Sequence, residues 1–325
     1  MNQFIFSLGI IFSGFILGYV VQVLIRKKLI SVPYDIHVLR KALQTLALLF
    51  FSPIATIGAV WILNFEDLKI IALPFIGIIT LFLGGVIAFL FTKMLRMPRK
   101  QAGAFIVCGG FSNIGAIGGL LCYTMLGEAG YALVAIYKLF EEIGYYGLGF
   151  PVAKLFSGAT GEAESVPARL KKIILDPFVL VSLASLLAGM LLNISNLERP
   201  GFYKPLNDVF VPVRTILLLA SIGMAMRFDR VGKYLKESVL IALIKFTLLP
   251  ALATTMAAFL GMGAIDRGLP LKVVIVLSSM PVAFIAMIPP TIYDLDVDLA
   301  NAAWLVTTSM LLVVVPLQLF AISLV

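Results

Sequence analysis

The chain has 325 residues, of which 61% are hydrophobic and only 13% are charged. A soluble domain of average composition carries roughly 25% charged residues, so this composition excludes a water-soluble globular fold. The 25 lysine and arginine residues outnumber the 17 aspartate and glutamate residues. Because the basic residues gather in alternate connecting segments, they indicate membrane orientation, and nucleic acid is not an expected partner.

Ten stretches of the sequence are long and apolar enough to cross a bilayer, which takes roughly 20 residues each. We therefore expect an all-α polytopic membrane protein with ten transmembrane helices and short loops. The expected helices cover residues 4–25, 42–63, 70–91, 102–126, 130–156, 173–194, 206–226, 239–261, 270–293 and 299–325.

The distribution of lysine and arginine predicts which loops face the cytoplasm. The first, third, fifth and seventh loops hold 17 of these residues, whereas the even-numbered loops hold 5. Basic loops stay in the cytoplasm, so both termini are expected outside the cell membrane. The ninth loop departs from the pattern, with Asp294, Asp296 and Asp298 and no basic residue, but acidic residues have little weight in this rule.

The ten segments fall into two halves of five, residues 1–156 and 173–325, joined by a predicted cytoplasmic linker at 157–172. The third and eighth helices begin near Ile70 and Val239, 169 residues apart, and Pro98 and Pro270 precede the fourth and ninth helices, 172 residues apart. Because five is an odd number, the second half is inverted relative to the first. Inverted repeats of this kind are typical of secondary transporters.

The fourth segment contains an unusual run, with five glycines among residues 108–119. One interpretation is close helix packing through Gly115 and Gly119. The other is a discontinuous helix, in which Ser112, Asn113 and Gly115 line a binding site near the bilayer midplane. Adding the repeat offset leads to the ninth segment, where Pro281 removes a backbone donor. There Ser278, Ser279 and Pro281 are the candidate binding residues.

Three stretches carry a family resemblance: Arg26-Lys27-Lys28 after the first helix, Phe111-Ser112-Asn113-Ile114-Gly115, and Met280-Pro281-Val282-Ala283. With them the chain resembles the auxin efflux carrier family of permeases. The resemblance implies two inverted five-helix repeats whose fourth and ninth helices cross at their breaks. It also implies a scaffold bundle, a mobile bundle and secondary transport of organic anions. The bile-acid:sodium symporters share this architecture, so sodium-coupled transport is the alternative, and a channel is a more distant one.

Ionisable residues inside a membrane are candidates for function. Lys138, Glu141 and Glu142 share one helical face. They form either a structural ion pair or a coupling site for H⁺ or Na⁺. Arg214 is the candidate cation for an anionic substrate, whereas Lys245 is expected to extend to the membrane surface, because it lies only six residues into its predicted helix.

Enzymatic activity is not expected. The sequence has no G-x-x-x-x-G-K-[ST] phosphate loop, the only histidine, His37, has no catalytic partner, and no cluster has metal-ligand spacing. We therefore expect no catalytic site, metal or cofactor. The expected partners are the bilayer and a small organic anion, and a homodimer is an open alternative to a monomer.

The predicted orientation can be tested with single cysteines at Gln3 and Gly161 in a cysteine-free protein. An impermeant thiol reagent applied to intact cells is expected to label Gln3→Cys and to leave Gly161→Cys unlabelled until the cells are opened. Labelling of Gly161→Cys but not of Gln3→Cys in intact cells would show that the true orientation is the opposite one.

Overall fold

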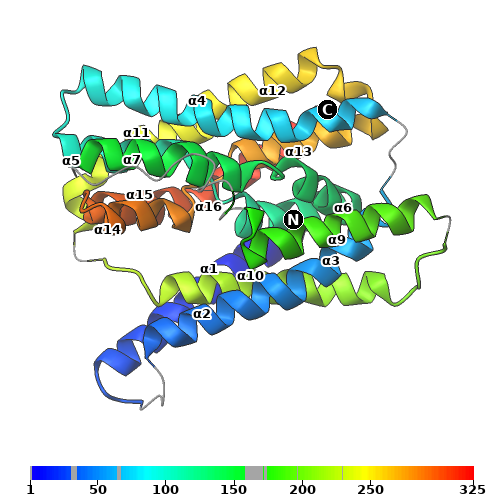
Figure 1. The fold of residues 1–325 in the computed structure, drawn as a ribbon, viewed down its shortest axis with the longest axis horizontal. Helices are drawn as coiled ribbons and strands as arrows, with labels where there is room; N and C mark the ends of the chain where they lie inside the picture. Colours follow the sequence, from blue (N-terminus) through cyan, green and yellow to red (C-terminus); the bar gives the residue numbers. More distant parts are fainter. Residues whose placement is uncertain are drawn as a thin grey trace. The chain divides into compact units, whose positions relative to one another are not determined.

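Most of the chain that the structure describes is helical. The computed structural model describes residues 2–30, 35–63, 67–157, 171, 174–195, 197–228 and 230–325. Within these ranges the backbone forms α-, π- and 3-10 helices and no named strand, and Figure 1 draws coiled ribbons only. One isolated β-bridge joins Ser112 and Val282. The all-α prediction is confirmed for these residues.

Seven helices in the described ranges are long and apolar enough to cross a membrane. An eighth qualifies if Val297–Ser309 and Leu311–Ser323, which are bent by 50° relative to each other, form one span. These helices fit a multi-pass membrane protein. The seven are Ile5–Arg26, Ile36–Val60, Leu68–Met94, Ile114–Tyr137, Pro177–Ile194, Tyr203–Gly223 and Val231–Phe259.

The predicted count of ten is not confirmed, because three predicted segments are not single long helices. α5 (Arg99–Gly110) has 12 residues and α13 (Leu269–Ser278) has 10. These reach about 18 and 15 Å, against a hydrocarbon core of about 30 Å. α6 (Gly119–Tyr137) joins the fourth predicted segment to the fifth through Gly127, whose φ of 75° and ψ of −166° are not helical. A turn then interrupts the fifth segment at 138–140.

Packing divides the chain into two compact units. Unit 1 comprises Met1–Phe65, Gly115–Ala135 and Leu180–Met226; unit 2 comprises Glu66–Ile114, Ile136–Val179 and Arg227–Val325. Each unit therefore takes segments from both predicted halves. The division into repeats at 1–156 and 173–325 stays a prediction, and most of the linker, 157–172, lies outside the described residues.

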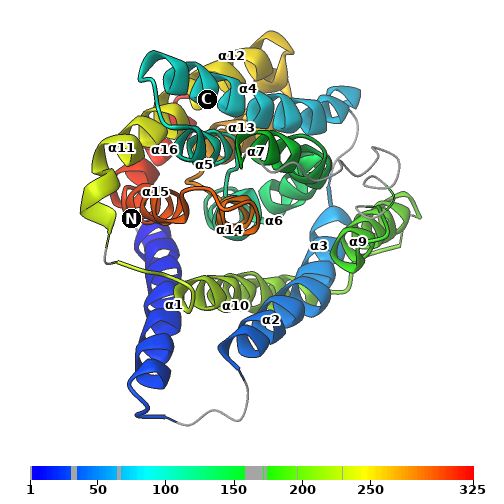
Figure 2. The ribbon, with the colours of Figure 1, turned by 60° about the vertical axis from the view of Figure 1, so that its left-hand side comes forward.

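In unit 1 the other helices pack around α10 (Tyr203–Gly223). α1 (Asn2–Arg26) lies along α10, as do α2 (Ile36–Leu46), η1 (Ala47–Phe51) and α3 (Ser52–Val60) (Figure 2). A Cβ atom on Gly18 would lie 1.9 Å from the carbonyl oxygen of Ala220, so glycine is needed where α1 meets α10. α9 (Pro177–Ile194) is joined to the end of α3 by Asn193, whose amide donates to the carbonyls of Trp61 and Leu63.

One face of α10 is polar, and it binds the segment 115–135. Asn207 and Arg214 are seven residues apart, as are Asp208 and Thr215, so the four lie on one side of the helix. Four hydrogen bonds follow from this spacing: Asn207 to Glu128 at 2.7 Å, Tyr123 to Asp208 at 2.6 Å, Arg214 to Tyr131 at 2.6 Å and Thr215 to the Ala116 carbonyl at 3.3 Å.

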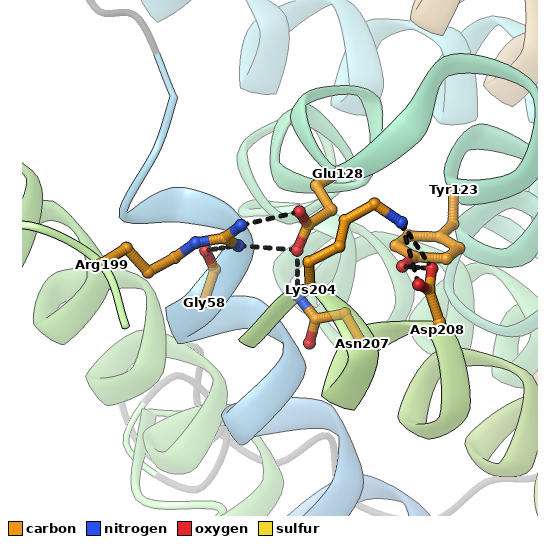
Figure 3. A network of polar contacts seen from close by, with 7 residues as sticks. All are labelled: Gly58, Tyr123, Glu128, Arg199, Lys204, Asn207 and Asp208. Carbon is orange, nitrogen blue, oxygen red and sulfur yellow. Dashed lines mark hydrogen bonds and ion pairs between the residues drawn. The ribbon is translucent and has the colours of Figure 1, made fainter. Parts of the chain in front are cut away.

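Glu128 is the centre of a buried polar network in unit 1 (Figure 3). Its carboxylate oxygens accept hydrogen bonds from Nη1 and Nη2 of Arg199 at 2.7 and 2.9 Å, and Arg199 also donates to the Gly58 carbonyl at 2.9 Å. Only 6% of the Glu128 side chain is exposed, against 49% of Asp208 in its pair with Lys204. Breaking a buried pair costs about 3–5 kcal/mol, whereas an exposed pair contributes about 0–1 kcal/mol. Removal of one partner of the Glu128–Arg199 pair is therefore expected to destabilise the protein more than removal of one partner of the Asp208–Lys204 pair.

Unit 2 contains the remaining helices. α5 packs against α4 (Leu73–Met94) and α7 (Phe150–Ser157), α12 (Leu249–Phe259) packs against α13 and α4, and α11 (Leu235–Leu243) packs against α15 (Val297–Ser309). In Figure 1, α4 and α12 lie side by side. The other elements of this unit are η2 (Leu68–Ala72), η4 (Ile143–Gly149), η5 (Val231–Tyr234), η6 (Ile244–Leu248), η7 (Met262–Ala264), η8 (Asp266–Gly268), η9 (Phe284–Met287), α14 (Ile288–Ile292) and α16 (Leu311–Ser323). η3 (Ile114–Gly118) begins at the boundary of the units.

Three π-helical segments precede prolines at the same distance. η1, η4 and η6 end two residues before Pro53, Pro151 and Pro250. A proline inside a helix has no N–H to donate and clashes with the carbonyl four residues earlier. A wider turn ahead of the proline realigns the hydrogen bonds around the missing donor, so each helix continues with a local bulge.

Candidate functional site

The first interruption of a helix lies between α5 and η3. α5 stops at Gly110, Phe111 is extended with φ −81° and ψ 122°, and helical geometry resumes at Ile114. Close helix packing also occurs here, but at a different glycine from the one expected. A Cβ atom on Gly109 would lie 2.4 Å from the Cβ of Ala88, so glycine is needed where α5 meets α4.

The second interruption follows α13, and its backbone pairs with the first. Ser279 leaves helical geometry at φ −101° and ψ 33°, and the next helical turn, η9, begins at Phe284. The Asn113 N–H donates to the Pro281 carbonyl at 2.8 Å, and the Ala283 N–H donates to the Phe111 carbonyl at 3.0 Å. Between these two bonds lies the antiparallel bridge of Ser112 and Val282. Two extended tripeptides in unit 2 thus pair like a minimal sheet.

Side chains from two further helices complete the hydrogen bonding of the bridge. The Tyr145 hydroxyl donates to the Ser112 carbonyl at 2.9 Å, and the Val282 N–H donates to the Thr307 hydroxyl at 3.2 Å. The Tyr145 ring also packs on Phe111, with ring centroids 4.2 Å apart. Since a buried backbone group without a partner costs free energy, these contacts make the two breaks stable inside the protein.

The predicted site residues Ser112, Asn113 and Pro281 are therefore brought together, because the backbone of each takes part in the pairing of the two interruptions. Ser112 and Asn113 are 7% and 6% exposed. Ser278 and Ser279 come directly before it and are buried, but their hydroxyls donate to carbonyls of α13, those of Val274 and Ile275. Gln318 of α16 donates to the Ser279 hydroxyl at 2.8 Å.

Lys245 is at this site, and the expectation that it reaches the membrane surface is wrong. Its side chain is fully buried, and its Nζ donates to the Ser112 hydroxyl at 2.9 Å. The error came from the helix boundary. The span runs from Val231 to Phe259, so Lys245 is its midpoint and not one of its first turns. The polar residues Lys233, Lys236 and Glu237 hid the first turns of this helix, so no signal in the sequence marked its true start.

The three predicted coupling residues differ in their relation to the site. The Tyr145 hydroxyl lies 2.5 Å from Glu141 Oε1, so Glu141 is connected to Ser112 through one tyrosine. Among the described side chains, Lys138 and Glu142 take part in no hydrogen bond or ion pair. Lys138 nevertheless interacts electrostatically with Glu141 and Glu142, and its two interpretations, a structural ion pair and a coupling site, stay predictions.

Arg214 and Gly115 belong to unit 1 and are bonded to each other there. Arg214 is 3% exposed, and it donates to the Gly115 carbonyl and to the Tyr131 hydroxyl. Its Nε is buried without a hydrogen-bond partner in the part of the chain that the structure describes. Arg214 thus orders the start of the 115–135 segment. As for metals, the described residues contain no group of three or more His, Cys, Asp or Glu side chains that could hold an ion.

Comparisons with known proteins agree with a transport role. Residues 37–163 match a family model described as membrane transport protein. An uncharacterized transporter of Methanocaldococcus jannaschii is 25% identical over 255 residues, covering 78% of this chain and 79% of the relative. An uncharacterized transporter of Methanothermobacter thermautotrophicus is 25% identical over 248 residues, covering 76% and 77%.

The chain is similar to membrane transporters. This confirms the resemblance predicted from the three sequence stretches, and the match includes the first interruption at 111–113. Together with the apolar helices, it supports a multi-pass membrane protein that transports a solute. Transporters are in general not enzymes, which agrees with the expectation from the sequence.

Thr307 provides a test of how the interruptions are stabilised. Thr307→Val removes the acceptor of the Val282 N–H and is expected to cost about 1–3 kcal/mol, the penalty of an unpaired buried donor. Thr308→Val is the matched control, because the Thr308 hydroxyl is buried without a partner among the described residues and its loss is expected to be neutral or stabilising. Thermal unfolding of the purified protein in detergent measures both. Equal destabilisation by the two variants would contradict the assigned role of Thr307.

Proposed function

We propose that this protein is a secondary active transporter of a small organic anion, most simply a carboxylate, which it binds at the paired interruptions. The observation that carries the proposal is the backbone pairing of Phe111–Asn113 with Pro281–Ala283 in a chain that is similar to transporters. Non-helical backbone at membrane depth is tolerated where it is buried or lines a cavity, and transporters bind substrates at such breaks.

The chemistry of the break favours an anion. Helices restart at Ile114 and Phe284, and the first turn of a helix carries a partial positive charge. The Asn113 side chain carries two amide donors in addition. We infer that Ser112, Asn113, Ser278, Ser279 and Pro281 of unit 2 surround the substrate; the roles of Gly115 and Arg214, which belong to unit 1, stay predictions.

The same pairing supports the proposal of ten helices in two inverted repeats. The bridge at the centre joins Ser112 to Val282, 170 positions later, and the flanking bonds join Phe111 to Ala283 and Asn113 to Pro281, symmetrically about that bridge. The offset agrees with the 169 and 172 found from the helix starts and prolines. Equivalent residues of two repeats meet each other only on a two-fold axis, so we propose that the axis passes through the Ser112–Val282 bridge.

For the transport cycle we propose alternating access, with unit 1 as the scaffold bundle and unit 2 as the mobile bundle. Unit 2 contains both interruptions, so a substrate bound there would move with one body. In this proposal the termini are outside, as the lysine and arginine distribution favours.

Substitutions of Asn113 test the substrate site. Asn113→Ala is expected to weaken carboxylate binding by about 1–3 kcal/mol, the value of a hydrogen bond to a charged group. Asn113→Leu is expected to stop transport, and Asn113→Asp to do so more completely for an anion, because it adds a negative charge of nearly the same shape. Uptake into proteoliposomes and thermal unfolding measure function and folding separately. Parental transport by folded Asn113→Leu would show that the solute binds elsewhere.

For the coupling ion we propose H⁺, bound by Glu141. The Tyr145 hydroxyl has one hydrogen, yet it is close to two oxygens, the Ser112 carbonyl and Glu141 Oε1. If Glu141 carries a proton, its carboxyl group donates to the Tyr145 hydroxyl, and Tyr145 donates to the Ser112 carbonyl, so each acceptor has a hydrogen-bond donor. If Glu141 is ionised, its carboxylate competes for the same hydrogen. The protonation of Glu141 is thus connected to the break.

Glu141→Gln is expected to abolish accumulation driven by a pH gradient while preserving substrate exchange, because the amide cannot release a proton. Glu142→Gln is the matched control and is expected to retain accumulation, since Glu142 has no hydrogen bond to the site among the described residues. The measurement is uptake by reconstituted vesicles with an imposed pH or sodium gradient. Uptake that requires sodium and ignores pH would favour the sodium-coupled alternative over H⁺.

A further inference from the structure

The described part of the protein offers no counter-ion for the basic side chain of Lys245. The side chain is fully buried at the midpoint of the Val231–Phe259 span. Its one hydrogen bond among the described residues goes to a neutral group, the Ser112 hydroxyl. No aspartate or glutamate forms an ion pair with it among the described residues.

The neighbours of Lys245 within unit 2 do not replace a counter-ion. Cys108 of α5 is the titratable group that interacts with it electrostatically, and a thiol is normally uncharged. Glu141 is reached only through Ser112 and Tyr145, and its Oε1 is occupied by the Tyr145 hydroxyl. A buried ammonium group without a paired anion is strongly unfavourable, so an anion bound beside Lys245 would stabilise its charged form.

The hydrogen bonds of this pair leave donors for such a ligand. An ammonium group has three N–H donors, and one of them is used by Ser112. Because the Ser112 oxygen accepts that bond, its own hydrogen is available, and no acceptor for it occurs among the described side chains. Two ammonium hydrogens and one hydroxyl hydrogen therefore remain next to the first helix break. A carboxylate accepts several hydrogen bonds from such a set and supplies the missing negative charge.

We propose that the Lys245 ammonium, together with the Ser112 hydroxyl, binds the carboxylate of the transported solute and is its principal counter-ion. This rests on the proposed function and specifies it: the solute presents one carboxylate to unit 2, and its remaining part needs no second negative charge. Lys245 is a binding residue in this proposal, whereas Arg214 is already bonded to Tyr131 and Gly115.

The test uses Lys245→Met, which keeps the length of the side chain and removes the charge. The purified full-length protein is titrated with acetate, phenylacetate and succinate, and with phenylacetamide as the uncharged analogue of phenylacetate. Binding is followed by the shift in thermal unfolding. We expect Lys245→Met to weaken carboxylate binding at least 30-fold and to bring the affinity for phenylacetate to that for phenylacetamide.

The unfolding temperature without ligand separates a binding role from a structural one. If Lys245 serves to bind an anion, Lys245→Met leaves the unfolding temperature without ligand unchanged or raises it. If Lys245 has a structural partner, this temperature falls. Lys236→Met is the matched control, with the same substitution at an exposed lysine of the same span, and it is expected to change neither quantity. Lys245→Gln, which can still hydrogen-bond to Ser112, is expected to behave like Lys245→Met and serves if the methionine variant does not fold.

The outcomes distinguish the inference from the function on which it rests. If carboxylates bind the parent protein, Asn113→Ala weakens them and Lys245→Met does not, the role of Lys245 is overturned while the proposed site stands. If Lys245→Met lowers the unfolding temperature and leaves the preference for carboxylate over amide intact, Lys245 is structural. If none of the three carboxylates binds the parent, the proposed function itself fails.

Discussion

The constraint on which this structure depends is that the bilayer offers no hydrogen bonds to a polypeptide backbone. A helix satisfies its own N–H and C=O groups, and a break in it exposes several of them at once. Here the two breaks form hydrogen bonds with each other, from Asn113 to Pro281 and from Ala283 to Phe111. The hydroxyls of Tyr145 and Thr307 bond to the remaining backbone groups, the Ser112 carbonyl and the Val282 N–H. Neither interruption would be tolerable alone, so the two form one structural element although 170 residues separate them.

Three cationic side chains in the protein interior differ in the number and charge of their hydrogen-bond partners. Arg199 meets Glu128 in a two-pronged ion pair, and Arg214 is surrounded by a carbonyl and a phenol. Lys245 contacts one hydroxyl. The first arrangement is complete and holds helices together, and the second is nearly so. Neither Arg214 nor Lys245 has an ion-pair partner among the described residues, but Lys245 has the fewer hydrogen bonds and lies beside the interrupted backbone. In this molecule, buried cations with several hydrogen-bond partners stabilise helix packing, and the one with a single partner is the one that we propose binds the solute.

Local chemistry explains what could be predicted from the sequence. Hydropathy indicated a membrane protein, because a run of about twenty apolar residues is stable only in a bilayer. The glycines before Ser112, together with Pro281, indicated where helices stop, because these residues change the conformation of their own backbone. The offset between the halves was readable for the same reason, since helix starts and prolines mark positions without any knowledge of packing.

What could not be predicted depends on other helices. Nothing near Tyr145 or Thr307 in the sequence indicates that their hydroxyls complete the bridge at Ser112 and Val282. The direction of Lys245 was predicted wrongly because the start of its helix was placed at 239 and not at 231, which moved a central residue to an end. The π segments before Pro53, Pro151 and Pro250 also escaped prediction, because a proline alone suggests a kink as readily as a bulge.

The bridge between the two breaks uses main-chain atoms only, and this has a consequence for how such a protein can evolve. Asn113 and Ala283 donate equivalent bonds, one from a residue with a polar side chain and one from a residue with a methyl group. The hydrogen bonds of the pairing therefore place no demand on these side chains, and burial limits their size. Residues at 112, 113, 282 and 283 can be exchanged for others without loss of the pairing, so a lineage can acquire a new solute by substitutions at these positions while the architecture of the membrane domain is inherited unchanged.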